Sequence, residues 1–183
     1  MVCGGMPRTG KLRCTAMDPA FRVVLVAPEI PPNTGAVART CAATGSPLHL
    51  IEPLGFDIDE RAVRRAGIDY WHLVDLHVHP TLTDFRADHP AGRMHLFSTD
   101  ASRSYLDVDF EPGDSLVFGC ESVGLPRELL QAHPDRVCGI PTSGAVRSLN
   151  LSNSVAIALY EALRAGEHLS PTFVEAAAPP EPS

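Results

Sequence analysis

The chain has 183 residues, of which 44% are hydrophobic and 20% are charged, and its formal net charge at pH 7 is −7. This length and composition fit one globular domain with a sizeable core and exclude a fibrous or low-complexity chain. The acidic balance argues against a protein that coats nucleic acid without specificity, although it leaves room for a local basic patch. The apolar run at 23–27 is far too short to span a bilayer, so we expect no membrane partner.

The cysteines and the two ends of the chain favour a protein of the reducing cytosol. The five cysteines are odd in number and include no C-x-x-C pair, which argues against a disulfide framework and a zinc site. We therefore expect a cytoplasmic protein without a bound metal. Residues 1–18 contain no apolar signal-peptide region, and residues 169–183 are rich in Ala, Pro and Glu. These patterns predict a single domain at 19–168 between two disordered ends.

Short apolar runs alternate along the chain with helix-like patterns. The apolar runs predict strands at 21–27, 48–51, 70–74, 94–98, 115–119 and 136–140. The intervening spacings and caps predict helices at 33–44, 59–66, 82–87, 126–132 and 151–165. In the first helix, Asn33 or Thr34 is the expected N-cap and Gly45 the expected C-cap residue. The alternation predicts one three-layer α/β domain with a mostly parallel sheet.

Two clusters of cationic or ligand-type side chains allow more than one interpretation. Arg61, Arg64 and Arg65 share one face of the predicted helix at 59–66, either as a solvated surface or as a phosphate-binding patch. His77 and His79 alternate, so in a strand they would share one face, as two metal ligands might. No third ligand follows at a suitable spacing, so we do not predict a metal site.

Two stretches rich in glycine and serine, at 117–126 and 140–153, are the strongest candidates for a functional site. Each begins as an apolar run and then breaks into a polar loop, and such loops at the ends of parallel strands bind ligands in open α/β sheets. Familiar motifs are excluded: Leu125 and Pro126 stand where a P-loop needs Lys and Ser or Thr, and no G-x-G-x-x-G follows the first strand. A serine-hydrolase elbow also fails, because Cys120 stands two residues before Ser122 where glycine is required.

Three segments together resemble the motifs of SPOUT RNA 2′-O-ribose methyltransferases. They are PEIPPNTG at 28–35 followed by Arg39, FGCESVGLP at 118–126, and IP at 140–141 with RSLNLSN at 147–153. The intervening LIEPLGF and RRAGIDY resemble one branch of that family, the tRNA (cytidine/uridine-34-2′-O)-methyltransferases, which modify the wobble nucleotide of certain leucine tRNAs. The resemblance runs from about Phe21 to Ala165.

The resemblance implies a SPOUT fold with a C-terminal deep trefoil knot, an exception to the rule against threaded chains. It implies S-adenosyl-L-methionine as cofactor, no metal, a tRNA substrate, and a homodimer whose active site draws on both protomers. Cofactor contacts would come from Phe97, Gly119, Gly124, Ile140, Ser148 and Leu149. Catalysis or substrate binding would involve Asn33, Arg39, Glu121, Ser148, Asn150 and Tyr160. Arginines for RNA contact are Arg61, Arg64, Arg65, Arg103, Arg127 and Arg147.

The role of Arg39 stays open between a general base, as proposed in the family, and an electrostatic stabiliser. Because a guanidinium is essentially never deprotonated in proteins, we favour stabilisation of the developing alkoxide or of the adjacent phosphate. Two other functions stay open as well. One is a SPOUT enzyme that acts on another tRNA position or on ribosomal RNA, and the other is a knotted RNA-binding protein without turnover.

Overall fold

The computed structural model of the protein describes residues 10–14, 17–57, 71–169 and 172–176. A six-stranded sheet has the order β4-β3-β2-β6-β5-β7, and every neighbouring pair in it is parallel. Its strands are β2 (Arg22–Val26), β3 (Leu48–Ile51), β4 (Leu76–His79), β5 (Met94–Phe97), β6 (Ser115–Phe118) and β7 (Val137–Cys138). The chain leaves β2 towards β3 and leaves β6 towards β7, which are opposite directions. The carboxyl ends of β2 and β6 therefore flank a topological switch point.

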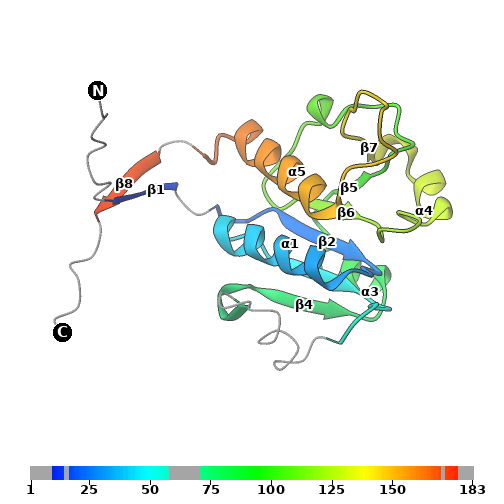
Figure 1. Cartoon of the computed structure of the whole chain (residues 1–183), viewed down its shortest axis with the longest axis horizontal. Helices are drawn as coiled ribbons and strands as arrows, with labels where there is room; N and C mark the ends of the chain where they lie inside the picture. The colour runs from blue at the N-terminus through cyan, green and yellow to red at the C-terminus, as the bar shows by residue number, and fades with distance from the viewer. Residues whose placement is uncertain (1–9, 15–16, 58–70, 170–171, 177–183) are drawn as a thin grey trace.

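Helices cover both faces of this sheet. The helices α1 (Pro31–Thr44) and α5 (Leu151–Ala165) lie side by side over one face, as Figure 1 shows. The shorter α3 (Leu82–Asp88) and α4 (Arg127–Ala132) pack on the other. Successive side chains of β2 pack against the helices on opposite faces of the sheet: Val23 and Leu25 face α1 and α5, whereas Val24 faces α3. The predicted three-layer arrangement with a mostly parallel sheet is confirmed.

The helix α1 begins earlier than the sequence pattern predicts. Its N-cap is Ile30, without a side-chain cap bond, and Pro31 and Pro32 form its first turn. Proline suits this place because the first-turn N–H groups have no partner within the helix. The prediction that Asn33 or Thr34 caps the helix is therefore wrong, whereas Gly45 is the C-cap residue as predicted, with a left-handed φ of 70°.

The helix α5 matches its predicted bounds of 151–165. Its buried stripe consists of Val155, Ala158, Leu159, Ala162 and Leu163. Asn150 is its N-cap, and the side-chain oxygen accepts from the backbone N–H groups of Ser152 and Asn153. The prediction succeeds because the apolar periodicity of the sequence matches the stripe that the helix buries.

The edge strand β4 differs from the prediction of a strand at 70–74. A short 3₁₀ helix covers Trp71–Leu73, and the segment that pairs with β3 is Leu76–His79, with His77 in register with His49. The Nδ1 atom of His49 lies 3.0 Å from Nε2 of the buried His79. Burial first, and then the neighbouring rings of His77 and His89, lower the pKa of His49 to about 3. Within the described ranges, no group of three or more His, Cys, Asp or Glu residues has a metal-binding arrangement.

A buried carboxylate organises the amino end of the sheet. Asp114, just before β6, is 2% exposed and accepts hydrogen bonds from Arg93 (2.7 Å) and His95 (2.8 Å). Although burial alone raises the pKa of Asp114, the bonds from His95, Arg93 and the backbone N–H of Glu111 outweigh it. The pKa therefore lies well below its usual range. We call Asp114, Arg93 and His95 the amino-end cluster.

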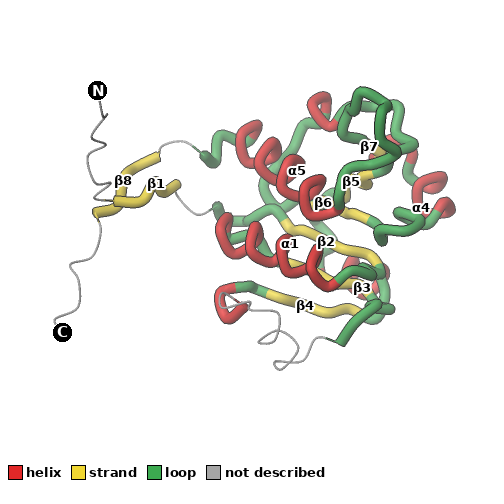
Figure 2. The backbone as a smooth tube through the Cα atoms, viewed as in Figure 1, coloured by secondary structure: helices red, strands yellow, loops and turns green. Residues whose placement is uncertain are grey.

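Outside the main sheet, β1 (Gly10–Cys14) and β8 (Thr172–Ala176) pair in antiparallel register. They form a separate two-stranded sheet near the chain ends, as Figure 2 shows. The sequence did not predict this pairing, because strand pairing between segments about 160 residues apart leaves no local pattern. The predicted helix at 59–66 with Arg61, Arg64 and Arg65 lies outside the described residues. Among the described helices, none is long and apolar enough to cross a membrane.

Candidate functional site

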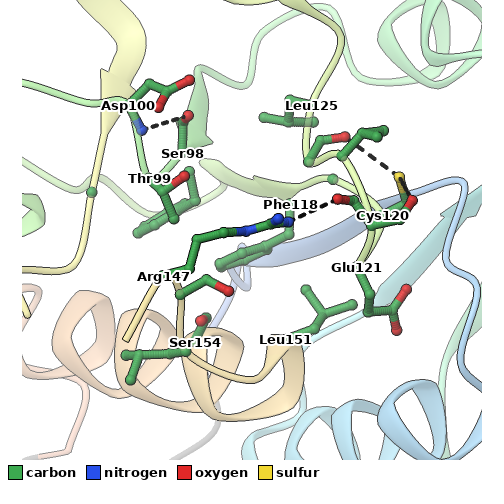
Figure 3. A pocket seen from close by; sticks show the side chains of 18 of the residues that line it. Ser98, Thr99, Asp100, Phe118, Cys120, Glu121, Leu125, Arg147, Leu151 and Ser154 are labelled. Carbon is green, nitrogen blue, oxygen red and sulfur yellow. Dashed lines mark hydrogen bonds between the residues drawn. The ribbon is translucent and has the colours of Figure 1, made fainter. Parts of the chain in front are cut away.

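A pocket of about 750 Å³ opens at the carboxyl ends of the central strands. Four segments supply most of its lining, and each follows a strand or precedes α5: 97–100, 118–127, 139–142 and 147–151. Figure 3 shows side chains from the segments 97–100, 118–127 and 147–151 around the pocket. Because β2 and β6 flank the switch point, the pocket lies where open parallel sheets bind small molecules.

The loop after β6 folds tightly back on itself. Cys120 and Gly124 form an isolated bridge, in which the Gly124 N–H donates to the Cys120 carbonyl at 3.0 Å. A Cβ on Gly119 would lie 2.0 Å from the carbonyl carbon of Gly124, and Gly124 itself has φ +77°. Both positions therefore require glycine. The result is a cradle whose wall is backbone rather than side chain.

The carboxylate of Glu121 joins this loop to the segment after β2. It accepts from the backbone N–H groups of Glu29 (2.8 Å) and Ile30 (3.3 Å) and from Nδ2 of Asn33 (2.9 Å). Asn33 in turn accepts at Oδ1 from Nδ2 of Asn150, at 2.9 Å. Since Oδ1 of Asn150 caps α5, a continuous chain of hydrogen bonds runs from the loop after β6 to the start of α5.

Aromatic and cationic side chains complete the pocket. The rings of Phe97 and Phe118 stack with centroids 4.6 Å apart and form a largely buried apolar wall. Arg147 reaches from the loop before α5 to the loop after β6, where its guanidinium donates to the Ser122 carbonyl at 3.0 Å (Figure 3). The pocket therefore combines an apolar wall, backbone amides and carbonyls, and few charged groups, as sites for small organic ligands do.

Most residues that the sequence assigns to the site lie together in this pocket. The lining includes Asn33, Phe97, Gly119, Glu121, Gly124, Ile140, Ser148, Leu149 and Asn150. Arg39 and Tyr160 do not line it: Arg39 is exposed on α1, and Tyr160 is 46% exposed on α5. Of the candidate RNA-contacting arginines, Arg127 and Arg147 line the pocket, whereas Arg103 does not.

Sequence reasoning missed one polar segment of the pocket. Ser98, Thr99 and Asp100 follow β5 directly and line the cavity, and the Asp100 N–H donates to Ser98 Oγ at 3.1 Å. Their signal was present, because three polar residues after a buried strand mark a ligand-facing loop in a parallel sheet.

The comparisons with known proteins agree with this geometry. The model of the SpoU rRNA methylase family matches residues 20–160. A tRNA (cytidine(34)-2′-O)-methyltransferase of Burkholderia ambifaria is 49% identical over 148 residues, which are 79% of this chain and 94% of that protein.

Two solved structures extend the comparison. One, described as giving structural insights into the 2-OH methylation of C/U34 on tRNA, is 46% identical, with a TM-score of 0.75, and covers 80% of this chain and 97% of that one. An AdoMet-bound rRNA methyltransferase from Sinorhizobium meliloti is 26% identical, with a TM-score of 0.70, and covers 79% of this chain and 56% of that one. The resemblance drawn from the three motifs is thereby confirmed, and the chain belongs to the SpoU methylase family.

Proposed function

We propose that this protein transfers a methyl group from S-adenosyl-L-methionine to the ribose 2′-OH of nucleotide 34, a cytidine or uridine, in a leucine tRNA. The observation that carries the proposal is the meeting of the loops at 118–126 and 147–153 in one pocket. The relatives that are 46% and 49% identical, whose names refer to C/U34 or to cytidine 34, support the tRNA substrate. Such a substrate implies the cytoplasm as the place of action.

The pocket fits the proposed cofactor. A Cβ at Gly119 would fill the cradle, so the backbone there is shaped for close approach to a ligand. Residues that would hold S-adenosyl-L-methionine are Phe97, Gly119, Gly124, Ile140, Ser148 and Leu149. When bound, this cofactor supplies an electrophilic methyl group on a sulfonium ion. The AdoMet-bound state of the Sinorhizobium meliloti relative supports the assignment.

The protein's contribution is positioning and the exclusion of water. Holding two reactants in contact geometry removes much of the entropic barrier of a displacement reaction. The positive sulfonium and the developing negative alkoxide neutralise one another during the transfer, and such a reaction is faster where water is excluded. The apolar wall of Phe97 and Phe118 favours the exclusion of water. The chain of Glu121, Asn33 and Asn150 fixes the orientation of each amide, so that the loops keep one arrangement.

We propose further that the enzyme works as a homodimer in which Arg39 and Tyr160 of one protomer complete the site of its partner. The exposed position of both residues outside their own pocket supports this proposal. The exposed apolar side chain of Ile157 on the same helix as Tyr160 supports it as well. Arg39, with its permanent charge, would stabilise the developing alkoxide or hold the adjacent phosphate.

We infer that the C-terminal part of the domain at 19–168 forms the trefoil knot of the SPOUT fold. Two observations support the knot. β7 is the last strand at one edge of the sheet, yet α5, which follows it, packs near β6 and beside α1 at the centre. The segment between them must therefore return across the carboxyl ends of β5 and β6.

The decisive experiment maps 2′-O-methyl groups in RNA. Purified protein is incubated with S-adenosyl-L-methionine and unmodified bulk tRNA or ribosomal RNA, and methylation is located by nucleotide. We expect a new methyl group at nucleotide 34 of leucine tRNA. Methylation at another tRNA position or in ribosomal RNA would reassign the substrate, and binding of RNA without any methylation would identify a non-catalytic RNA-binding protein.

A further inference from the structure

The carboxylate of Glu29 lies outside the pocket and accepts hydrogen bonds from the loop after β6. Its Oε2 accepts from the Ser122 backbone N–H at 3.0 Å, and its Oε1 accepts from the Ser122 hydroxyl at 2.8 Å. The exchange is reciprocal, because the carboxylate of Glu121 accepts from the backbone N–H of Glu29. Two segments more than 90 residues apart are thus joined by one carboxylate from each side.

Apart from Glu121, whose carboxylate accepts three hydrogen bonds, the loop at 120–124 has few anchors. Ser122 and Gly124 are exposed, and Val123 is 84% exposed, so no apolar side chain anchors its tip. Three contacts hold the tip: the Cys120–Gly124 bridge, where the Cys120 sulfur also lies 3.7 Å from Ser122 Oγ, Arg147 at the Ser122 carbonyl, and Glu29. Glu29 is the only one of these three that binds both the amide and the side chain of Ser122.

The backbone of Glu29 is itself firmly placed. Ala27, two residues earlier, has φ 50°, a left-handed conformation that a non-glycine residue adopts at a cost. A Cβ on Gly55 would lie 2.8 Å from the Glu29 Cα, so the loop after β3 packs closely against Glu29. The Gly55 N–H also donates to the Pro28 carbonyl at 2.9 Å. Glu29 therefore presents its carboxylate from a rigid base.

We propose that Glu29 is a positioning residue that holds the loop at 119–124 in the shape required to bind the methyl donor. The proposal rests on the proposed function, because it takes S-adenosyl-L-methionine as the ligand of that loop. Glu29 does not line the pocket, so its influence on binding acts through Ser122 and the backbone of the loop.

The two hydrogen bonds between Glu29 and Ser122 suggest three substitutions at Glu29 and one control. Glutamine at 29 keeps the length and offers one oxygen to the Ser122 N–H and one N–H₂ group to the Ser122 hydroxyl, which can turn to accept. Aspartate is one methylene shorter and cannot reach both groups. Alanine removes both bonds. Glu128→Ala is the matched control, since Glu128 is an exposed glutamate on α4 outside the pocket.

The test measures the affinity of the full-length variants for S-adenosyl-L-methionine by titration calorimetry, well below each variant's thermal unfolding midpoint. We expect Glu29→Ala to raise Kd about tenfold, the usual scale for losing hydrogen bonds to a charged acceptor. Glu29→Asp should resemble Glu29→Ala, Glu29→Gln should stay within about threefold of the wild type, and Glu128→Ala should not change Kd. In steady-state assays with tRNA, Glu29→Ala should raise KM for the donor and leave kcat within about twofold.

A double-mutant cycle with Ser122→Ala separates positioning from general stability. Because Glu29 acts through Ser122, the effects of the two substitutions on Kd should be clearly less than additive. Wild-type affinity in Glu29→Ala, or a Glu29→Gln variant as weak as Glu29→Ala, would overturn the inference while leaving the proposed function intact. A wild-type protein that binds no donor at all would overturn the proposed function and the inference together.

Discussion

The two ends of the central sheet hold carboxylates in opposite ways. At the amino end, the carboxylate of Asp114 is buried and paired with the cationic Arg93 and with His95. At the carboxyl end, the carboxylates of Glu29 and Glu121 are bound by backbone N–H groups, a hydroxyl and an amide. The first arrangement fixes the fold, and the second fixes the shape of two exposed loops.

The difference follows from what each end must do. Removing a partner from a buried charge lowers the free energy of unfolding strongly. A charged cluster therefore stabilises the amino end of the sheet, which is part of the fold and not of the pocket. Amide and hydroxyl donors satisfy a carboxylate with short, directional bonds and add no cation of their own. At the carboxyl end the two carboxylates are thus satisfied without a cation, although the Arg147 guanidinium binds the Ser122 carbonyl of the same loop.

Replacing Asp114 should have the largest effect, and it should act on stability alone. Asp114→Ala leaves Arg93 and His95 without their shared partner, so we expect the free energy of unfolding to fall by about 3 to 5 kcal/mol. Urea titration measures this change, with Asp109→Ala at a nearby exposed carboxylate as control. Donor affinity, measured where both proteins are folded, should not change. A loss below about 1 kcal/mol would contradict the role given to this cluster.

At the carboxyl end of the sheet, Gly119→Ala should disrupt the loop after β6 and its binding of the donor. Its Cβ would overlap the carbonyl carbon of Gly124 at 2.0 Å, so the cradle cannot keep its shape. We expect Kd for S-adenosyl-L-methionine to rise about a hundredfold or more. Gly45→Ala is the control for backbone strain, because Gly45 has φ +70° but open space around it. That variant should lose about 1 kcal/mol of stability and keep its donor affinity.

The same substitution at Glu121 and Glu29 should sharpen the contrast between the two carboxylates of the site. Both oxygens of Glu121 accept from N–H donors that cannot turn into acceptors, so Glu121→Gln places an N–H₂ group against them. We expect a rise in donor Kd of about tenfold for Glu121→Gln, against less than about threefold for Glu29→Gln. If calorimetry gave the same rise in Kd for both variants, the charge of the two carboxylates, and not the geometry of their hydrogen-bond donors, would determine donor affinity.

The smallest expected effect is the response of the amino-end cluster to acid. Because the folded-state pKa of Asp114 is depressed, its stabilisation is complete above its usual pKa of about 4 and is lost as pH falls further. The free energy of unfolding of the wild type should therefore fall more steeply below about pH 4 than that of Asp114→Asn. Parallel pH profiles for the two proteins would contradict the assignment.

The sequence predicted the elements whose local signals agree with one another. The apolar stripe predicted α5, and the loops that follow β6 and β7 were expected at the carboxyl edge where they lie. In contrast, β4 carries two histidines and pairs with β3 beside His49, and no local pattern reveals that pairing.

Asn33 illustrates the limit for single residues. As a polar residue near the start of a helix it fits an N-cap, yet its side chain binds Glu121 and Asn150, which are 88 and 117 residues away. The bond of Glu29 to Ser122 is equally remote. Contacts of this kind follow from strand order, and periodicity in one sequence does not reveal that β2 and β6 are neighbours.

The adjacency of β2 and β6 also bears on how the enzyme matures during translation. Strand β2 emerges from the ribosome early, but its neighbour β6 follows only after three other strand and helix units, so early folding intermediates lack the receptor for the methyl donor. Binding energy from the donor is then available only to chains that have completed nearly the whole sheet. The ligand would therefore stabilise finished molecules selectively and leave truncated products to proteolysis.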